Sequence, residues 1–275
     1  DELVNDYDAD PDKIVTIPAA VNTSRFHPID KQQARKRLRL DPQRPTIVYV
    51  GRLLPRKGIR TVVQALAAMK RAIDHQDDSG VWQIPLLVVV GGESPDPDPE
   101  ITPEIGELQR LATELGVREH VHFTGQEQPD DLRYVYSAAE VAVTTPWYEP
   151  FGLTPLEAMA CGRPVIGSAV GGLTFTIVDG QTGYLVPPHD PTALAERLTR
   201  VLRDPALAAE MGTHARARVN REFTWPIVAQ RLDTVYRQLL WRGSEEMPAR
   251  LMTNGDFTAT RHLDDARYAE LWESD

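Results

Sequence analysis

Strands and helices alternate along most of this chain, and that alternation limits the folds it can adopt. Apolar stretches of strand length occupy residues 46–51, 84–92, 120–125, 140–146, 164–168 and 183–188. Helical patterns separate them, and strands that alternate with helices of this length form parallel βαβ units with right-handed crossovers. We therefore predict an α/β fold with a Rossmann-like, doubly wound parallel sheet of about six strands.

Helical patterns also fill much of the carboxyl-terminal third. The expected helices cover residues 31–40, 59–73, 103–115, 130–139 and the stretch after Glu149, and a helical region runs over residues 191–240. We expect breaks in that region near Pro205, Gly212 and Pro226, because glycine and proline interrupt helices.

Composition divides the chain into three parts. Residues 1–28 are an acidic lead-in followed by a short strand and a turn-rich crossing, and residues 29–240 form the Rossmann-like domain. Residues 241–275 are a polar carboxyl-terminal extension, with a short helix expected over residues 264–272.

Residues that are hard to explain by packing follow the predicted strands. Gly51 and Arg52 end the first strand, Lys57 follows a few residues later, and Glu149 follows the fourth strand. The second and third strands end in residues 91–93 and Gly125. Because ligands bind beyond the carboxyl ends of parallel strands, we expect these four strand ends to line one cleft.

Arg52 and Lys57 are the candidate anion ligands. Gly51 allows the backbone of their loop to approach a ligand closely, and each charge-assisted hydrogen bond contributes about 1.5–3 kcal/mol. The alternative is a solvated surface pair, which is the commonest fate of such residues.

Residues 148–168 combine a turn, a helix start and two carboxylates. Glu149 precedes the turn, and Glu157 lies in the helix that follows. The backbone N–H groups of Gly152, Leu153 and Thr154 stand at the helix start, where they attract anions. A carboxylate accepts hydrogen bonds from hydroxyls, so the stretch suits a ligand that is both anionic and hydroxyl-rich, such as a nucleotide sugar. The alternative for Glu157 is an ordinary glutamate on a helix surface.

Other binding motifs are weak or missing in the sequence. Asp96 and Asp98 have the spacing of a metal-binding D-x-D motif but lie among prolines, and His120 and His122 lack a third ligand at zinc spacing. The chain contains no G-x-x-x-x-G-K-[ST] and no G-x-G-x-x-G after the first strand, so ATPase and NAD-dehydrogenase functions lack their phosphate loops. We expect no metal site and no cofactor.

Net charge, the longest apolar run and cysteine content limit the classes of partner and the compartment that we expect. A net charge of −10 argues against nucleic acid or an anionic membrane surface. The longest apolar run, residues 84–90, is far shorter than the roughly 20 residues that cross a bilayer. Cys161 is the single cysteine, which is consistent with a reducing, cytoplasmic location.

Five longer motifs follow one another along the chain. They are GRLLPRKG (residues 51–58), FTG (123–125), E-x7-E (149–157), AMACGRPVIGSAVGG (158–172) and DGQTGYLVPP (179–188). With them, the chain resembles the carboxyl-terminal, donor-binding domain of a retaining glycosyltransferase of the GT-B fold, in the large group 1 family (family 4 type). The resemblance runs over residues 13–240.

The resemblance implies roles for the candidate residues. Arg52 and Lys57 would bind the donor diphosphate and stabilise charge as it departs, Glu149 would contact the donor sugar near the reacting centre, and Glu157 would bind the ribose. The backbone near Gly125 and Gln126 would hold the base. Transfer of a hexosyl group to an acceptor hydroxyl would keep the anomeric configuration and would need no metal.

The resemblance also implies that half of an enzyme is missing. A GT-B enzyme has a second, amino-terminal domain that binds the acceptor, and we expect turnover to require it. An alternative is a free-standing nucleotide-sugar-binding or regulatory module without catalysis, and a less favoured one is a GT-B epimerase. The strand ending in GG and the loop ESPDPDPE resemble group members that act on small soluble acceptors, including the sucrose-phosphate synthase group. The sequence leaves the base, the sugar and the acceptor open.

Overall fold

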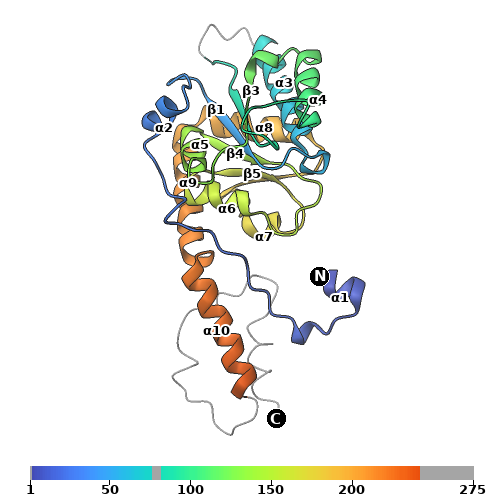
Figure 1. Ribbon diagram of the computed structural model, residues 1–275, viewed down its shortest axis with the longest axis vertical. Coiled ribbons are helices and arrows are strands. Elements are labelled where there is room, and N and C mark those ends of the chain that lie inside the picture. Colours follow the sequence, from blue (N-terminus) through green and yellow to red (C-terminus); the bar gives the residue numbers. More distant parts are fainter. Residues whose placement is uncertain (1, 76–81, 242–275) are drawn as a thin grey trace. The chain divides into compact units, whose positions relative to one another are not determined.

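The computed structural model, which describes residues 2–75 and 82–241, confirms the α/β fold (Figure 1). Six parallel strands form one sheet in the order β3-β2-β1-β4-β5-β6. Their bounds are β1 Thr46–Val50, β2 Leu86–Val90, β3 Val121–Gly125, β4 Val141–Thr144, β5 Val165–Ser168 and β6 Gly183–Val186. From β1 the chain adds β2 and β3 on one side, and from β4 it adds β5 and β6 on the other. This is the doubly wound arrangement that the alternation of strands and helices predicts.

Helices cover both faces of the sheet. On one face α3 (Ile59–His75), α4 (Pro103–Glu114) and α8 (Pro191–Arg203) pack against Ile47 and Tyr49 of β1. On the other face α5 (Leu132–Ala138), α6 (Leu153–Ala160) and α9 (Pro205–Glu222) pack against Val48. Successive residues of a strand point to opposite faces, so a sheet buried on both sides needs continuously apolar strands.

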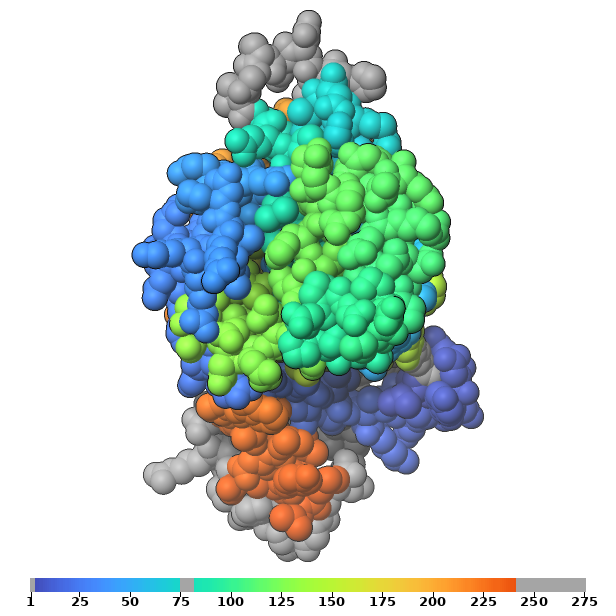
Figure 2. Space-filling view, turned by 45° about the horizontal axis from the view of Figure 1, so that its top comes forward, coloured from blue at the N-terminus to red at the C-terminus, as the bar shows by residue number. Residues whose placement is uncertain are grey.

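Shorter elements complete this part of the chain. They are α2 (Lys31–Arg37), α7 (Leu173–Thr176) and the 3-10 helices η2 (Pro55–Lys57) and η3 (Arg118–His120). Helix α2 lies beside α5, where Arg37 pairs with Asp131, and the two helices are neighbours in the space-filling view (Figure 2).

The chain forms two compact units. Ala19–Trp225 contains the whole sheet. The described part of the second unit holds α1 (Glu2–Tyr7), η1 (Pro11–Lys13) and α10 (Trp225–Trp241) from Pro226 onward. In α10, Asp233 and Arg237 form an ion pair one turn apart. The helix expected over residues 264–272 and the extension from residue 242 lie outside the described residues.

Two local predictions were wrong. The short strand expected before residue 28 is reduced to one bridge between Val21 and Thr224, because the turn between α9 and α10 offers a single partner residue rather than a strand edge. The break expected at Gly212 is absent, since α9 continues through it. A Cβ on Gly212 would lie 2.2 Å from the carbonyl oxygen of Gly162, so glycine is needed there for close packing of α9 on the end of α6.

The other two breaks are confirmed. Asp204 ends α8 and caps α9, where its side chain accepts a hydrogen bond from the N–H of Leu207. Pro205 and Pro226 occupy the first turns of α9 and α10, where a proline costs no intrahelical hydrogen bond.

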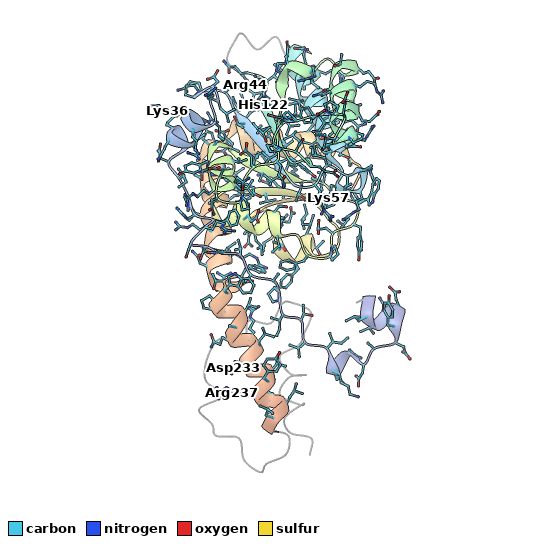
Figure 3. The ribbon with its side chains drawn as sticks, in the orientation of Figure 1. Lys36, Arg44, Lys57, His122, Asp233 and Arg237 are labelled. Carbon is cyan, nitrogen blue, oxygen red and sulfur yellow. The ribbon has the colours of Figure 1, made fainter. Side chains whose placement is uncertain are left out.

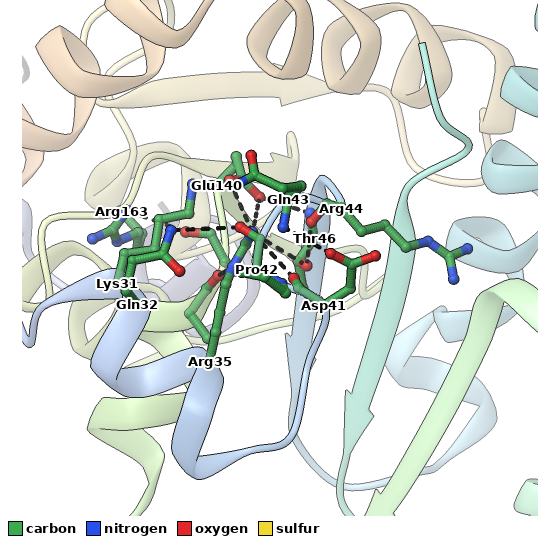
Figure 4. A network of polar contacts seen from close by, with 12 residues as sticks. Lys31, Gln32, Arg35, Asp41, Pro42, Gln43, Arg44, Thr46, Glu140 and Arg163 are labelled. Carbon is green, nitrogen blue, oxygen red and sulfur yellow. Dashed lines mark hydrogen bonds and ion pairs between the residues drawn. The ribbon is translucent and has the colours of Figure 1, made fainter. Parts of the chain in front are cut away.

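A buried ionic network ties α2 to the amino ends of the two central strands (Figure 4). The guanidinium of Arg35 is 2% exposed and donates to both carboxylate oxygens of Glu140, each at 3.0 Å. It also donates to the carbonyl oxygen of Ala138 at 2.9 Å. Glu140 in turn accepts from the backbone N–H of Thr46 at 2.6 Å and pairs with Lys31. A buried charge is tolerated only when it is paired and hydrogen-bonded in this way.

Gly212→Ala should destabilise the protein. An alanine in a helix interior normally gains about 1 kcal/mol over glycine, but here its methyl group meets the Gly162 carbonyl. Urea denaturation should therefore give a lower free energy of unfolding. Ala217→Gly, an exposed change on the same helix, measures helix propensity alone, and a stabilised Gly212→Ala variant would contradict the close-packing explanation.

Arg35→Met should lower the free energy of unfolding by about 3 kcal/mol, because it removes one partner of a buried ion pair. Arg37→Met is the matched control on the same helix: the Arg37 side chain is 53% exposed, and because solvent screens an exposed ion pair, its loss should cost far less stability. Equal losses in the two variants, measured by urea denaturation, would show that burial of the Arg35–Glu140 pair is unimportant.

Candidate functional site

A cleft opens where the carboxyl ends of β1 and β4 meet. The two strands are neighbours, yet the chain leaves them in opposite directions across the sheet, which creates the crevice where ligands of open α/β sheets bind. The cleft has a volume of about 500 Å³. Its lining residues are Ala19, Tyr49, Val50, Gly51, Arg52, Lys57, Thr144, Glu149, Pro150, Phe151, Gly152, Leu153 and Thr154.

Most of the residues selected from the sequence lie in this cleft. Both candidate cations, Glu149 and the start of α6 are among its lining residues. Lys57 is at the opposite end of β1 from Arg44 (Figure 3). Gly125, Gln126 and Glu157 are not in the lining.

Of the four strand ends expected to line one cleft, those of β1 and β4 do so, and those of β2 and β3 are not among its lining residues. A Cβ on Gly91 would lie 2.0 Å from the carbonyl oxygen of Gly51, and one on Gly125 would lie 2.2 Å from that of Pro95. At both glycines, neighbouring backbone therefore occupies the space that a side chain would need. The N–H of Gln126 donates to the carbonyl oxygen of Ser94 at 2.8 Å, so this backbone donor is already used.

The loop after β1 is fixed from two sides. The hydroxyl of Tyr49 donates to the carbonyl oxygen of Arg52 at 3.1 Å, and burial raises the pKa of that hydroxyl, as does the charge of Glu149. Gly58 has a φ of 69° and packs so tightly that a Cβ would lie 1.8 Å from the carbonyl oxygen of Thr145. The Thr145 hydroxyl donates to the Gly58 carbonyl at 2.8 Å. The loops after β1 and β4 are therefore held together.

Lys57 and Glu149 face each other across the cleft as an ion pair. Their side chains are 17% and 14% exposed, so the pair is shielded from most of the solvent. Arg52 is exposed, and in the part of the chain that the structure describes its side chain makes no ion pair. The cleft therefore holds one cation, Lys57, whose charge is neutralised by Glu149, and a second, Arg52, whose charge is available to a ligand.

The backbone around Glu149 is held by the glycine pair that follows β5. The N–H of Gly172 donates to the carbonyl oxygen of Glu149 at 2.9 Å. A Cβ on Gly171 would lie 2.3 Å from that oxygen, and one on Gly172 would lie 2.4 Å from the Cα of Phe151. These contacts need glycine at both positions.

The amino end of α6 faces the cleft without a side-chain cap. Gly152 stands at the cap position with a φ of 84°, and no side chain accepts from the first turn of the helix. The first N–H groups of a helix lack intrahelical partners and carry partial positive charge. Together with Arg52 and Lys57, they make this end of the cleft suitable for an anion.

Glu157 lies further along α6, outside the cleft lining. Its Oε2 accepts a hydrogen bond from the hydroxyl of Tyr136 at 2.8 Å. Burial raises the pKa of Glu157, while the Tyr136 hydrogen bond and the charge of Arg25 act against that shift. Nothing in the sequence around Tyr136 pointed to this contact.

The described residues offer no evident metal centre. Among residues 2–75 and 82–241, no three His, Cys, Asp or Glu side chains gather in a way that could hold a metal ion. His120 contacts Arg44 at 2.6 Å through Nδ1. Within the same residues, no helix combines the length and apolar character needed to cross a membrane.

Comparisons with known proteins agree with this geometry. Residues 30–218 match the family model described as glycosyl transferases group 1. The chain is 39% identical over 239 residues to a D-inositol 3-phosphate glycosyltransferase of Acidothermus cellulolyticus, a match covering 87% of this chain and 51% of that protein. The chain spans about half the length of the curated relatives it matches.

Solved structures share the fold of this chain. Sucrose-phosphate synthase from Thermosynechococcus elongatus is 41% identical, with a TM-score of 0.69, over 83% of this chain and 53% of that one. Anabaena HepE, solved with UDP and glucose, shares the fold with a TM-score of 0.67 at 22% identity, over 80% of this chain and 55% of that one.

The thiol of Cys161, at the end of α6, should be unreactive in the folded protein. Burial raises the pKa of this thiol to about 12, and only the thiolate is a good nucleophile. We expect no reaction with Ellman's reagent at pH 8 under native conditions and reaction of the single thiol after denaturation in guanidinium chloride. Rapid native labelling would contradict the close packing of this helix end.

Proposed function

The chain belongs to the group 1 glycosyl transferases, and from that membership we propose that it forms the donor half of a retaining glycosyltransferase that binds a nucleoside-diphosphate sugar. One observation carries the proposal: a single cleft, at the switch point of the sheet, combines cations and an uncapped helix start with a carboxylate. The first two suit a diphosphate, and the third suits sugar hydroxyls.

The diphosphate would lie between the loop after β1 and the start of α6. Arg52 and Lys57 would donate charge-assisted hydrogen bonds to its oxygens, and the N–H groups of Gly152, Leu153 and Thr154 would donate from the helix start. Gly51 would let the loop backbone approach the ligand. The solved complex of HepE with UDP and glucose supports a uridine diphosphate donor as the first to test.

Glu149 would accept hydrogen bonds from hydroxyls of the donor sugar, which is a hexose in this proposal. When the bond between the anomeric carbon and the diphosphate breaks, negative charge develops on the leaving oxygen and oxocarbenium-like character on the sugar. Arg52 and Lys57 would stabilise the leaving group, so we propose that they act as catalytic cations and that the step needs no metal ion. An acceptor hydroxyl attacking from the face that the diphosphate leaves would retain the anomeric configuration.

Glu157 would bind the ribose, and the backbone at Gly125 and Gln126 would hold the base. These positions lie outside the lining of the cleft, so this assignment rests on the family motif and on the Glu157 carboxylate. Because the N–H of Gln126 is already bonded to Ser94, its carbonyl and side chain are the groups left for a base.

We further propose that turnover needs an amino-terminal acceptor-binding domain, on the same polypeptide or on a separate chain. The support is that full-length relatives are about twice as long as the matched region. In this proposal the Rossmann-like donor domain spans residues 29–240, residues 1–28 form the crossing toward the acceptor domain, and the protein acts in the cytoplasm.

Co-expression with an acceptor domain distinguishes this enzyme from a free-standing nucleotide-sugar-binding module. Radiolabelled sugar from UDP-glucose should be transferred only when both halves are present. Binding of the donor by residues 1–275 without transfer in any pairing would favour the binding module.

Arg52→Ala and Lys57→Ala should each weaken binding of a nucleoside diphosphate roughly tenfold to a hundredfold, because each loses a charge-assisted hydrogen bond of about 1.5–3 kcal/mol. Calorimetry with UDP-, ADP- and GDP-sugars and the matching diphosphates measures this and identifies the base. Lys36→Ala is the control, an exposed lysine at the other end of the domain (Figure 3). Unchanged affinity in both cleft variants would overturn the phosphate assignment.

A further inference from the structure

Among the described residues, the hydroxyl of Tyr136 is the one side-chain group that donates a hydrogen bond to the Glu157 carboxylate. Tyr136 stands on α5, its side chain is 1% exposed, and its hydroxyl donates to Oε2 of Glu157 at 2.8 Å. The two residues are 21 positions apart, so the contact is made by the packing of α5 against α6.

The surroundings hold the tyrosine in one place. Its ring lies in the apolar cluster formed by α5, α6 and α9, with Val48, Leu156 and Met159 among its members. The ring of Phe26 meets it edge-on at a centroid distance of 6.2 Å. A buried phenol that cannot reach water needs a hydrogen-bond acceptor, and the Glu157 carboxylate provides it.

This contact makes the two oxygens of Glu157 unequal. Oε2 is engaged by Tyr136, whereas no residue of the described ranges donates to Oε1. Rotation about the last bond of a glutamate side chain is broad when the carboxylate is free. A hydrogen bond from a fixed phenol restricts that rotation, so the direction of Oε1 is set before any ligand arrives.

We propose that Tyr136 is a positioning residue, which holds Oε2 of Glu157 and thereby presents Oε1 to a ribose hydroxyl of the nucleotide. The inference rests on the proposed function, because it takes Glu157 as the ribose ligand. It adds Tyr136, which does not touch the ligand but fixes the orientation of the Glu157 carboxylate that does. Preorganisation of this kind increases affinity by reducing the ordering that binding requires.

The same contact affects the charge of Glu157. Burial raises the pKa of the carboxyl group, and the Tyr136 hydroxyl on α5 and the Arg25 guanidinium on the segment before α2 counter that shift. Just after the end of α6 lies the thiol of Cys161, whose own pKa the charge of Glu157 raises. Removing the hydroxyl therefore raises the pKa of Glu157 further. A ligand that needs the ionised carboxylate then begins to lose affinity at a higher pH as the solution is acidified.

The test compares Tyr136→Phe with the unchanged chain, residues 1–275. The probes are the tightest-binding of UDP, ADP and GDP, and the 2′,3′-dideoxy form of the same nucleotide. Calorimetry gives the affinity for the nucleotide divided by the affinity for its dideoxy form, and this ratio measures what the ribose hydroxyls contribute to binding. We expect Tyr136→Phe to lower that ratio roughly fivefold, to leave binding of the dideoxy form unchanged, and to move the acid limb of the binding profile to higher pH.

Two controls separate positioning from general packing. Tyr184→Phe removes the hydroxyl of another buried tyrosine, on β6, whose ring lies against Arg197, and it should change neither the ratio nor the acid limb. Glu157→Gln keeps an oxygen that Tyr136 can bond but removes the ionisable group, so the ratio of the two affinities should no longer fall on acidification. Protonation of the phosphate affects both probes alike and cancels in that ratio. Thermal unfolding of each variant shows that the domain remains folded.

Each outcome decides a different statement. Suppose that Glu157→Gln lowers the affinity ratio, whereas Tyr136→Phe leaves both the ratio and the acid limb as they are in the unchanged chain. Tyr136 then has no positioning role, while the proposed function stands. If neither variant changes the ratio, the ribose assignment of Glu157 and this inference fall together, and diphosphate binding by Arg52 and Lys57 is unaffected. If the unchanged chain binds none of the three nucleotides, the proposed function itself fails.

Discussion

The parallel pairing of β1 with β4 is the constraint on which the site depends. Ile47 and Val48 pair with Val141 and Ala142 at the centre of the sheet, and the chain winds away from that pair in both directions. At the amino ends of the two strands, Glu140 joins Arg35 and the backbone of Thr46. Since the crevice of an open α/β sheet lies at this switch point, everything that keeps the two strands in register also keeps the cleft in shape.

Local charge, rather than the overall charge, determines what this cleft attracts. The chain carries a net charge of −10, yet Arg52, Lys57 and the amino end of α6 gather at one edge of the sheet. Other arginines are used for structure. Arg35 is buried against Glu140, and Arg218 donates to carbonyl oxygens at the end of α7. A cation serves a ligand only where the fold leaves it partly exposed and close to backbone donors.

The sequence predicts the sheet and much of the cleft because both follow from local patterns. Apolar runs mark each strand, and the rule that ligands bind beyond strand ends selects Arg52, Lys57 and Glu149 from many charged residues. Contacts between distant segments leave no such pattern. Gly212 looks like a helix break until α9 is seen to touch Gly162, and Tyr136 reads as an ordinary core residue until α5 meets α6. The same holds for the ends of β2 and β3, which lie outside the cleft lining and whose glycines have neighbouring backbone where a side chain would stand.

Because Lys57 pairs with Glu149, the cation at this position already has a counter-ion within the protein. An anion that takes Lys57 alone leaves a carboxylate that is 14% exposed without its partner, and an unpaired charge in such a place is costly. The proposed nucleotide sugar, which brings hydroxyls as well as phosphate, would give each member of the pair a new partner. If the proposed function is right, a molecule with both chemical features should therefore bind this cleft better than a molecule with only one, and free phosphate should compete poorly with it.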